Sequence, residues 1–203
     1  MRLSAHLTLL LAVLAVGCAT GSAPPAAPPT APVAPAATTP ARPKIYTQAE
    51  KTLLTDCEGL TDTAWNIAIR KVAGIKKEQV AAYYAKQPNT ELTSAAIEKV
   101  YGDTFTYPWD YSVSFFQECA LNIAHIQPKA SELGAYCMQN SMLSGLAQEH
   151  KAAGKTREQT CELLPLKGDT PRQMVDAVYA KPQTRAVAMM AAWDDCMAPI
   201  TGP

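Results

Sequence analysis

The stretch Lys71-Val72-Ala73-Gly74-Ile75-Lys76-Lys77-Glu78-Gln79 recurs 80 residues later as Lys151-Ala152-Ala153-Gly154-Lys155-Thr156-Arg157-Glu158-Gln159. Five of the nine positions are identical, and a sixth pairs Lys77 with Arg157. Self-similarity at a fixed offset is the sequence signature of an internal repeat. The chain therefore builds its folded part from two copies of one unit.

Other landmarks recur in the same order around this stretch. Cys57 lies 80 residues before Cys137, Val100-Tyr101 corresponds to Val178-Tyr179, and Phe116-Gln117-Glu118-Cys119 corresponds to Trp193-Asp194-Asp195-Cys196. Each copy thus begins and ends with a cysteine, and an aromatic residue stands three positions before the second one. We expect two tandem helical units over residues 45–126 and 127–203.

Helical periodicity and punctuation favour an all-α fold of about eight helices. Thr47 to Glu50 has the form of a capping box. The residues after it follow one helix face until Gly74, which predicts a stop. That face holds Leu53, Cys57, Leu60, Ala64, Ile67, Ala68 and Val72. Shorter helices fit about 76–86 and 90–101, and a longer one fits from Pro108 to about His125.

The second copy carries its own start signals. Pro128 suits the first turn of a helix. The tetrads beginning at Thr156 and at Thr170 both have capping-box form. Pro182 is expected to open the last helix, in which Met189, Trp193, Cys196 and Ile200 share a face. Each unit is therefore predicted to contain four helices.

Composition excludes some classes of protein. The chain of 203 residues has 18 Lys+Arg and 18 Asp+Glu, and it is 48% hydrophobic. A dedicated nucleic-acid binder would show a basic excess, so none is expected. After the first apolar run, no stretch is long enough to span a bilayer.

The N-terminus predicts export. Arg2 precedes a short apolar run over residues 7–16, which has the length of a signal peptide. The run ends in Ala15-Val16-Gly17-Cys18, which resembles the lipobox of bacterial lipoprotein precursors cleaved by signal peptidase II. The resemblance implies removal of residues 1–17 and fatty acylation of Cys18, such as palmitate. More than one acyl chain gives stable membrane anchoring.

Two features qualify this interpretation of the N-terminus. An ordinary signal peptide cleaved at Ala23 would discard Cys18. With lipidation, Ala19 after the cysteine favours the outer membrane, by resemblance to enterobacterial sorting. The globular part would then lie in the periplasm, and the alternative is a soluble periplasmic protein.

The segment 18–44 is predicted to be a linker. Residues 19–43 contain nine Ala and eight Pro, with Arg42 as the only charge. Proline removes backbone donors and fixes φ, so neither helix nor sheet is expected. At about 3.1 Å per residue, a polyproline-II-like spacer of this length would reach roughly 75 Å. A stand-off tether is favoured over a proline-rich ligand.

The cysteines fit an oxidising compartment, where disulfides persist. Equivalent positions of a repeat should pair alike, which predicts Cys57–Cys119 and Cys137–Cys196. Each bond would tie the first helix of a unit to its last. Closing a loop of about 60 residues stabilises by roughly 4 kcal/mol on the entropic model.

Cys161 has no counterpart, because Ala81 occupies the matching position. Three interpretations stay open for it. It is a buried free thiol, a reactive thiol, or half of an intermolecular bridge.

One segment of the first unit differs from the second. Five aromatic residues lie within residues 101–111, and the second unit lacks most of them. Rigid aromatic side chains are typical of binding interfaces and also of cores. Both interpretations stay open, and the candidate binding residues are Tyr101, Phe105, Tyr107, Trp109 and Tyr111.

No motif predicts catalysis, a metal or a cofactor. His125 and His150 lack metal spacing, and no Cys-x-x-Cys or glycine-rich phosphate loop occurs. Cys161 and His150 as nucleophile and base have nothing to orient them. Asp194 and Asp195 are adjacent and do not face each other on a helix. An enzyme would need a pocket around Glu118, His125 or His150 with a perturbed pKa.

The repeat resembles two-cysteine helical repeats of exported bacterial proteins with no assigned function, and the resemblance spans residues 57–196. We expect a non-catalytic lipoprotein that binds a protein partner, such as an immunity protein that neutralises a periplasm-acting toxin. The alternatives are a pilotin-like assembly factor and an envelope-stress or redox protein using Cys161. The lipid anchor would be the chain's only contact with the membrane.

Overall fold

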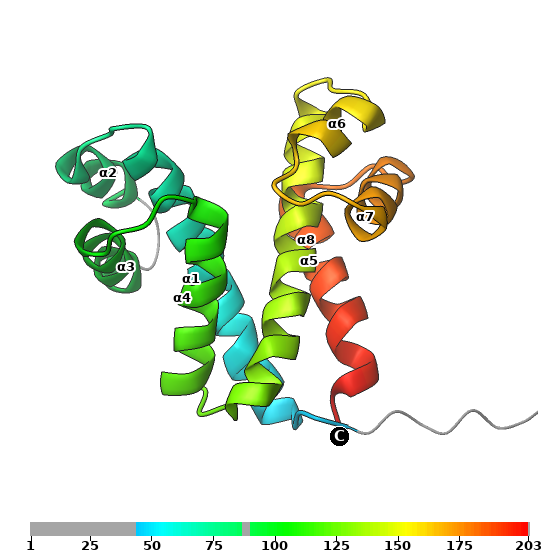
Figure 1. The fold of residues 1–203 in the computed structure, drawn as a ribbon, viewed down its shortest axis with the longest axis horizontal. Coiled ribbons are helices and arrows are strands. Elements are labelled where there is room, and N and C mark those ends of the chain that lie inside the picture. Colours follow the sequence, from blue (N-terminus) through cyan, green and yellow to red (C-terminus); the bar gives the residue numbers. More distant parts are fainter. Residues whose placement is uncertain (1–43, 87–89, 203) are drawn as a thin grey trace, which may run out of the picture. The chain divides into compact units, whose positions relative to one another are not determined.

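A computed structural model describes residues 44–86 and 90–202, and this part of the chain is all-α, as predicted (Figure 1). The helices are α1 (Gln48–Val72), α2 (Lys77–Tyr84), α3 (Thr90–Gly102), α4 (Pro108–Asn122), α5 (Pro128–Ala152), α6 (Arg157–Leu163), α7 (Asp169–Tyr179) and α8 (Arg185–Met197), followed by the short 3-10 helix η1 (Ala198–Ile200). We refer to α1–α4 as the first half and to α5–α8 as the second half. The predicted signal peptide, Cys18 and the Ala/Pro-rich stretch 19–43 lie outside the described residues.

Several helix starts follow the sequence signals. Thr47 caps α1 and forms a capping box with Glu50, and Thr156 forms one with Gln159 at the start of α6. Pro108 and Pro128 open α4 and α5, where a missing backbone N–H costs nothing. Local chemistry therefore sets these boundaries.

Glycines end the two long helices in the same way. Gly74 follows α1 with φ 78°, and Gly154 follows α5 with φ 76°. This left-handed conformation favours glycine and closes a helix C-terminus. The Ala-Gly pair of the repeated stretch is thus a helix stop in both halves.

Two predicted starts in the second half are wrong. α7 begins at Asp169 with Gly168 as its N-cap, so Thr170 already lies inside the helix. Gly168, with φ 118°, allows the chain to turn into the helix ahead of Thr170. α8 begins at Arg185 instead of Pro182, because the Thr184 hydroxyl accepts a hydrogen bond from the Val187 N–H and caps the helix there.

The predicted core face of α1 is also partly wrong. Leu53 is 40% exposed and Val72 is 55% exposed, whereas Leu54 is fully buried. Thr61 is buried too, because its hydroxyl donates to the Cys57 carbonyl at 2.7 Å. A threonine that satisfies its hydroxyl within its own helix escapes a search for apolar periodicity.

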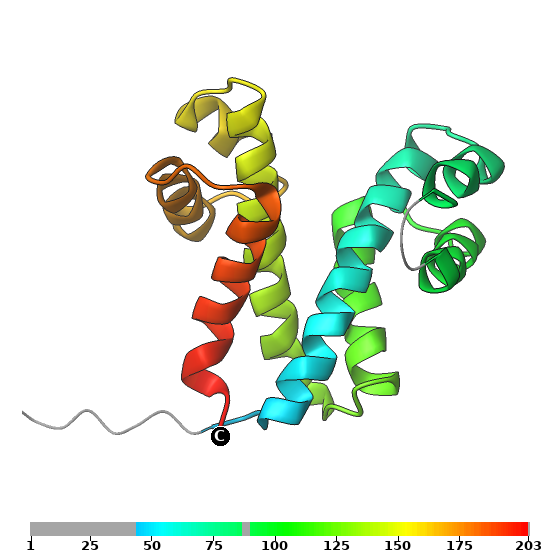
Figure 2. The ribbon, with the colours of Figure 1, turned by 180° about the vertical axis from the view of Figure 1, so that it is seen from behind.

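Each half is built on a pair of long helices, with two shorter helices between them in sequence. α1 packs against α4 and α3, and α5 packs against α8 and α7 (Figures 1 and 2). α4 also packs against α5, which joins the halves. Ridge-into-groove packing of helices is enough to build this arrangement without any sheet.

Helices of both predicted repeat units contribute to one hydrophobic core. Leu54 and Phe116 come from the first half, and Met138, Met142 and Trp193 come from the second. The rings of Phe116 and Trp193 meet at a centroid distance of 6.3 Å. A smaller cluster lies where the C-terminal part of α1 meets α2 and α3. All of the described residues belong to one compact unit.

The two ends of the described chain are tied together. The Ile45 and Tyr46 N–H groups donate to the Ile200 carbonyl, and the Gly202 N–H donates to the Tyr46 carbonyl. Figure 1 shows both ends at the opposite end of the helix pairs from α6. The chain that leads toward Cys18 therefore leaves the fold far from α6.

Candidate functional site

Two disulfides close the two halves in the same way. Cys57 is bonded to Cys119, and Cys137 is bonded to Cys196, at sequence separations of 62 and 59. Both pairs are those that the repeat predicts. Each bond joins the first helix of its half to the last, so the cysteines serve the scaffold.

The lysine of the repeated stretch has the same role in both halves. Lys71 and Lys151 each end a long helix and extend their ammonium groups to carbonyl oxygens at the end of a shorter one. Their partners are the carbonyl oxygens of Val100, Tyr101 and Asp103 for Lys71, and of Val178 and Lys181 for Lys151. A cation that satisfies helix C-terminal carbonyls fixes the angle between the two helices.

The tyrosine of the repeat adds a second contact between the end of the long helix and the shorter helix. The Tyr101 hydroxyl donates to the Ile75 carbonyl at 2.6 Å, and the Tyr179 hydroxyl donates to the Lys155 carbonyl at 2.6 Å. Ile75 and Lys155 occupy the same position of the repeated stretch. The motif that identifies the repeat is therefore structural, and function must come from what differs between the halves.

The aromatic segment of the first half does not form one surface. Trp109 is buried and meets Trp65 edge-on at 5.6 Å. Tyr101, Phe105 and Tyr111 are half-buried against the cluster of α1, α2 and α3. Only Tyr107 is strongly exposed, at 68%. Four of the five candidate binding residues thus take part in packing.

Tyr111 is held firmly in this packing. Its ring stacks on Phe105 at 4.2 Å, and its hydroxyl donates to Asp103 Oδ2 at 2.9 Å. Burial, followed by the Asp103 carboxylate, raises the pKa of Tyr111. Although burial alone would raise it, hydrogen bonds from Lys99 and Tyr111 hold the pKa of Asp103 below its ordinary value.

The second half has alanines where the first half has these rings. Tyr111 and Phe115 precede Cys119 by eight and four residues, and Ala188 and Ala192 precede Cys196 by the same numbers. Both stretches lie within helices whose N-caps, Tyr107 and Thr184, are also equivalent, so no gap intervenes. Two large aromatic side chains of α4 are thus replaced by methyl groups on α8.

A groove opens where the rings are missing. We call it the α7–α8 groove; its volume is about 350 Å³, and Met174, Val178, Ala188 and Ala192 form its apolar wall. Ala96 and Val100, which stand at the positions of Met174 and Val178 in the first half, belong to the cluster that Tyr111 and Phe115 pack against. In the first half, a hollow of about 540 Å³ lies between α3 and α4, but Phe105, Tyr111 and charged side chains such as Glu118 line it. The groove is therefore the apolar counterpart of a region that rings and charged groups line in the first half.

The wall that α5 contributes to the groove is polar. Asn140 and Ser144 line it and are only 8% and 4% exposed. The Asn140 amide group donates to Cys196 Sγ at 3.7 Å. Among residues 44–86 and 90–202, no hydrogen-bond partner exists for the Asn140 amide oxygen or the Ser144 hydroxyl. Neither atom is among the fully buried side-chain atoms without a partner, so solvent in the groove reaches both.

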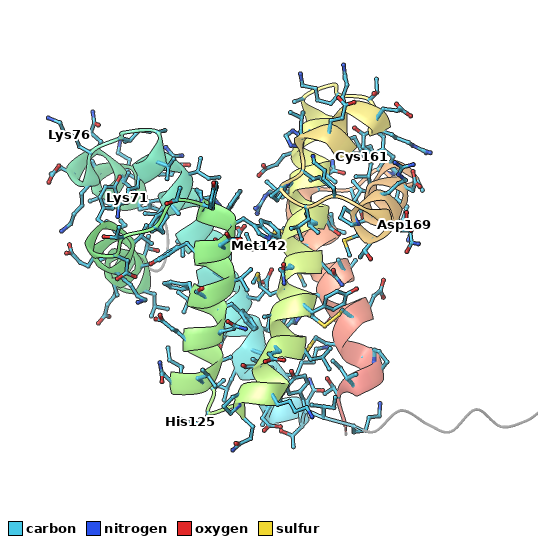
Figure 3. The ribbon with its side chains drawn as sticks, viewed as in Figure 1. Lys71, Lys76, His125, Met142, Cys161 and Asp169 are labelled. Carbon is cyan, nitrogen blue, oxygen red and sulfur yellow. A yellow bond between two sulfur atoms is a disulfide. The ribbon has the colours of Figure 1, made fainter. Side chains whose placement is uncertain are left out.

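Cys161 is the one free cysteine of the part of the chain that the structure describes, and it is half-buried. It lies in the wall of a cavity of about 600 Å³ between α6 and α7, with Arg157, Lys167 and Arg172 among its neighbours. Figure 3 shows Cys161 beside α6 and Asp169 at the start of α7. Cys161 has no disulfide partner among the described residues, and whether it is an inert, a reactive or a bridging thiol stays a prediction.

The histidines and acidic residues that could act as acids, bases or ligands lie on different elements. His125 lies in the turn between α4 and α5 with φ 53°, far from Cys161 in Figure 3. His150 lies in the last turn of α5. Glu118 pairs with Lys99 at 2.8 Å on α3, and Asp194 pairs with Lys51 at 2.7 Å on α1. No cluster of metal-ligating side chains occurs within the described residues.

A polar network that the sequence analysis missed joins the halves. The Arg185 guanidinium binds both oxygens of Asp62, at 2.9 and 2.5 Å, and its Nε lies 2.6 Å from Glu149 Oε1. The Ser141 hydroxyl lies 2.7 Å from Glu58 Oε1 and 3.1 Å from the Met189 carbonyl oxygen. These contacts connect α1, α5 and α8.

Glu58 is the least solvated carboxylate of this network. Burial raises its pKa, Ser141 and Arg185 lower it, and Asp62 raises it further. Repeat comparison could have exposed the network, because Glu58 and Asp62 occupy the positions of Met138 and Met142 in the second half. A carboxylate at a position that is apolar in the other copy indicates a polar contact that the other copy lacks.

No protein-family model, curated protein or solved structure matches the chain. The class of protein that the fold defines is an all-α protein of two disulfide-closed halves. No helix in the described ranges is sufficiently long and apolar to cross a membrane.

Proposed function

We propose that this chain is an exported, lipid-anchored binding protein that holds a partner protein in the α7–α8 groove. The observation that carries the proposal is the difference between the halves. Both copies keep the disulfide, the lysine joint and the tyrosine, but the groove of the second copy has small apolar side chains of α8 for a wall, whereas the corresponding hollow of the first copy is lined by Phe105, Tyr111 and charged side chains. Concave apolar sites with a few placed polar groups are typical of binding sites.

The predicted lipid anchor would be attached at one end of the helix pairs. The described chain begins at Lys44, at the opposite end of the helix pairs from α6 (Figure 1). A linker over 19–43 would join a lipid on Cys18 to the fold at Lys44. Lipidation itself is tested by palmitate labelling of the wild type and of Cys18→Ser, which should stay unlabelled.

The binding role is tested by photocrosslinking in the native host. A photoreactive amino acid replaces Gln173, an exposed residue of the groove rim, and in a matched control it replaces Ala95, the exposed equivalent on α3. We expect one crosslinked product of defined mass from position 173 and none from position 95. Products that are identical at both positions, or absent from both, contradict the proposal.

Mass spectrometry of the crosslinked product also separates the partner classes. A toxin acting in the periplasm supports the immunity-protein hypothesis, and a secretion or pilus component supports the pilotin-like hypothesis. The envelope-stress or redox hypothesis predicts instead that Cys161 reacts with a thiol reagent in the native state. We rank it second, because Cys161 lies in a separate cavity from the α7–α8 groove.

A further inference from the structure

We infer that the α7–α8 groove binds a tyrosine side chain presented by the partner protein. This inference rests on the proposed function and names the chemistry of that same site. The first half shows which side chains pack against such a surface. In the first half, the rings of Tyr111 and Phe115 fill the equivalent space against α1 and α3. In the second half, Ala188 and Ala192 leave that space open.

The shape of the groove favours an aromatic ring over an aliphatic side chain. Its walls match those that hold rings in the first half, with Met174 and Val178 in place of Ala96 and Val100. Methionine thioethers pack well against aromatic rings. An external ring enters from solvent, since the α8 backbone stands where α4 stands in the first half.

The polar groups of the groove favour tyrosine over phenylalanine. The buried Asn140 amide oxygen can accept a hydrogen bond from a phenolic hydroxyl, and the Ser144 hydroxyl can donate one to it. Both groups have no other hydrogen-bond partner among the described residues. Their equivalents in the first half are Leu60 and Ala64, so this polarity belongs to the open groove alone.

The rim adds charges that suit a protein partner. Lys181 and Asp195 lie at the edge of the groove, where the first half has Asp103 and Glu118. In the first half, Asp103 accepts the hydrogen bond of the buried Tyr111. A lysine at the corresponding position offers a donor to the phenolic oxygen instead.

The test uses p-cresol and toluene, the side-chain analogues of tyrosine and phenylalanine. Each is titrated into the oxidised full-length protein, and methyl NMR signals of Ala188, Ala192 and Met174 are followed. For a ligand of this size, a Kd on the order of 10 mM is expected for p-cresol. Toluene should bind several-fold more weakly, since it displaces water from Asn140 and Ser144 and offers them no hydroxyl in return.

Two variants locate and dissect the binding. A188Y/A192F introduces the rings of the first half, so p-cresol should no longer shift the methyl signal of Met174. If the double variant does not fold, Ala192→Phe alone, at a half-exposed site, replaces it. Asn140→Leu copies Leu60 and should reduce p-cresol binding to the level of toluene. Unchanged p-cresol binding in A188Y/A192F, equal affinity for both probes in the wild type, or shifts confined to the first half overturn the inference.

The outcomes separate this inference from the proposed function. Binding of p-cresol in the groove without a crosslink at position 173 supports the groove chemistry and contradicts the binding role. A crosslink at position 173 without p-cresol binding supports the role and overturns the tyrosine inference. When both succeed, the crosslinked peptide of the partner should contain a tyrosine.

Discussion

The two halves of this protein share a scaffold and differ in what fills it. Both have a long helix that ends at a left-handed glycine, a lysine that satisfies the carbonyls of a shorter helix, and a disulfide between their first and last helices. In the first half, aromatic rings of α4 pack against α1 and α3 and line a hollow together with charged side chains, whereas in the second half alanines of α8 leave an apolar groove. Residues that recur therefore maintain the fold, and residues that differ carry the candidate site.

The halves also differ at the contact between them. α1 presents Glu58 and Asp62 where α5 presents Met138 and Met142. Arg185 of α8 binds Asp62 and thus uses a charge that only the first half offers. The two halves therefore contact each other through charged groups that the repeat does not share.

Loss of a disulfide should have the largest effect, and it should be similar in both halves. Because the sequence separations are 62 and 59, each double variant, C57A/C119A or C137A/C196A, should lose about 4 kcal/mol of unfolding free energy. Urea unfolding followed by circular dichroism measures both. A loss below about 1 kcal/mol in one half alone would show that the two bonds are not equivalent.

Removal of the first-half rings should have the next largest effect. Y111A/F115A removes half-buried rings that pack against α1 and α3, and we expect a loss of about 3 kcal/mol. The matched control is Tyr107→Ala, which changes an exposed ring and should stay within about 0.5 kcal/mol of the wild type. Equal losses in both variants would mean that the rings do not stabilise the first half.

Removal of the lysine that binds helix-end carbonyls should have the third largest effect. The loss of unfolding free energy should be larger in the first half. Lys71→Met removes hydrogen bonds to three carbonyl oxygens and should cost about 2 kcal/mol, because charged donors contribute more than neutral ones. Lys151→Met removes two and should cost about 1 kcal/mol. Thermal unfolding of both variants checks the order, and a larger loss for Lys151→Met would reverse it.

The smallest expected effect is a dependence of the unfolding free energy on pH, caused by Glu58 at the contact between the halves. Burial raises the pKa of Glu58 in the folded state above its ordinary value of 4.5. The folded protein therefore holds this proton at pH values where the unfolded chain has lost it, so stability falls as the pH rises through the raised value. Glu58→Gln should remove this decline.

Urea unfolding of the wild type and Glu58→Gln at several pH values above 4.5 measures the difference. Glu58→Gln should become progressively more stable relative to the wild type as the pH rises. Its amide oxygen can still accept the hydrogen bond of Ser141. Stability profiles that stay parallel over this range would mean that Glu58 titrates alike in the folded and unfolded chains.

The sequence predicted those features that depend on local chemistry or on the repeat. The capping box of Thr47, the glycine stops and both disulfide pairs follow from residue types and from the equivalence of the copies. The start of α8 was missed because the Thr184 cap outweighs the proline signal at Pro182. Helix boundaries depend on such competition between neighbouring signals.

The candidate site was less predictable, because it is defined by packing. The aromatic segment drew attention to the first half, although Trp109 is buried and Tyr111 packs against other rings. The groove consists of small residues such as Ala188 and Ala192, which carry no signal of their own. Counting back from Cys119 and Cys196 pairs these alanines with Tyr111 and Phe115, but only the packing of α7 and α8 shows the groove that they line.

The most direct test of this account is a swap of the filling between the halves. The variant Y111A/F115A/A188Y/A192F should open the first half, close the second and keep both disulfides. Methyl NMR with p-cresol should then show shifts at Ala96 and Ile97 of α3 and none at Met174 of α7. Shifts that stay at Met174 in the folded variant, or that appear in neither half, would contradict the claim that these two positions decide which half is open.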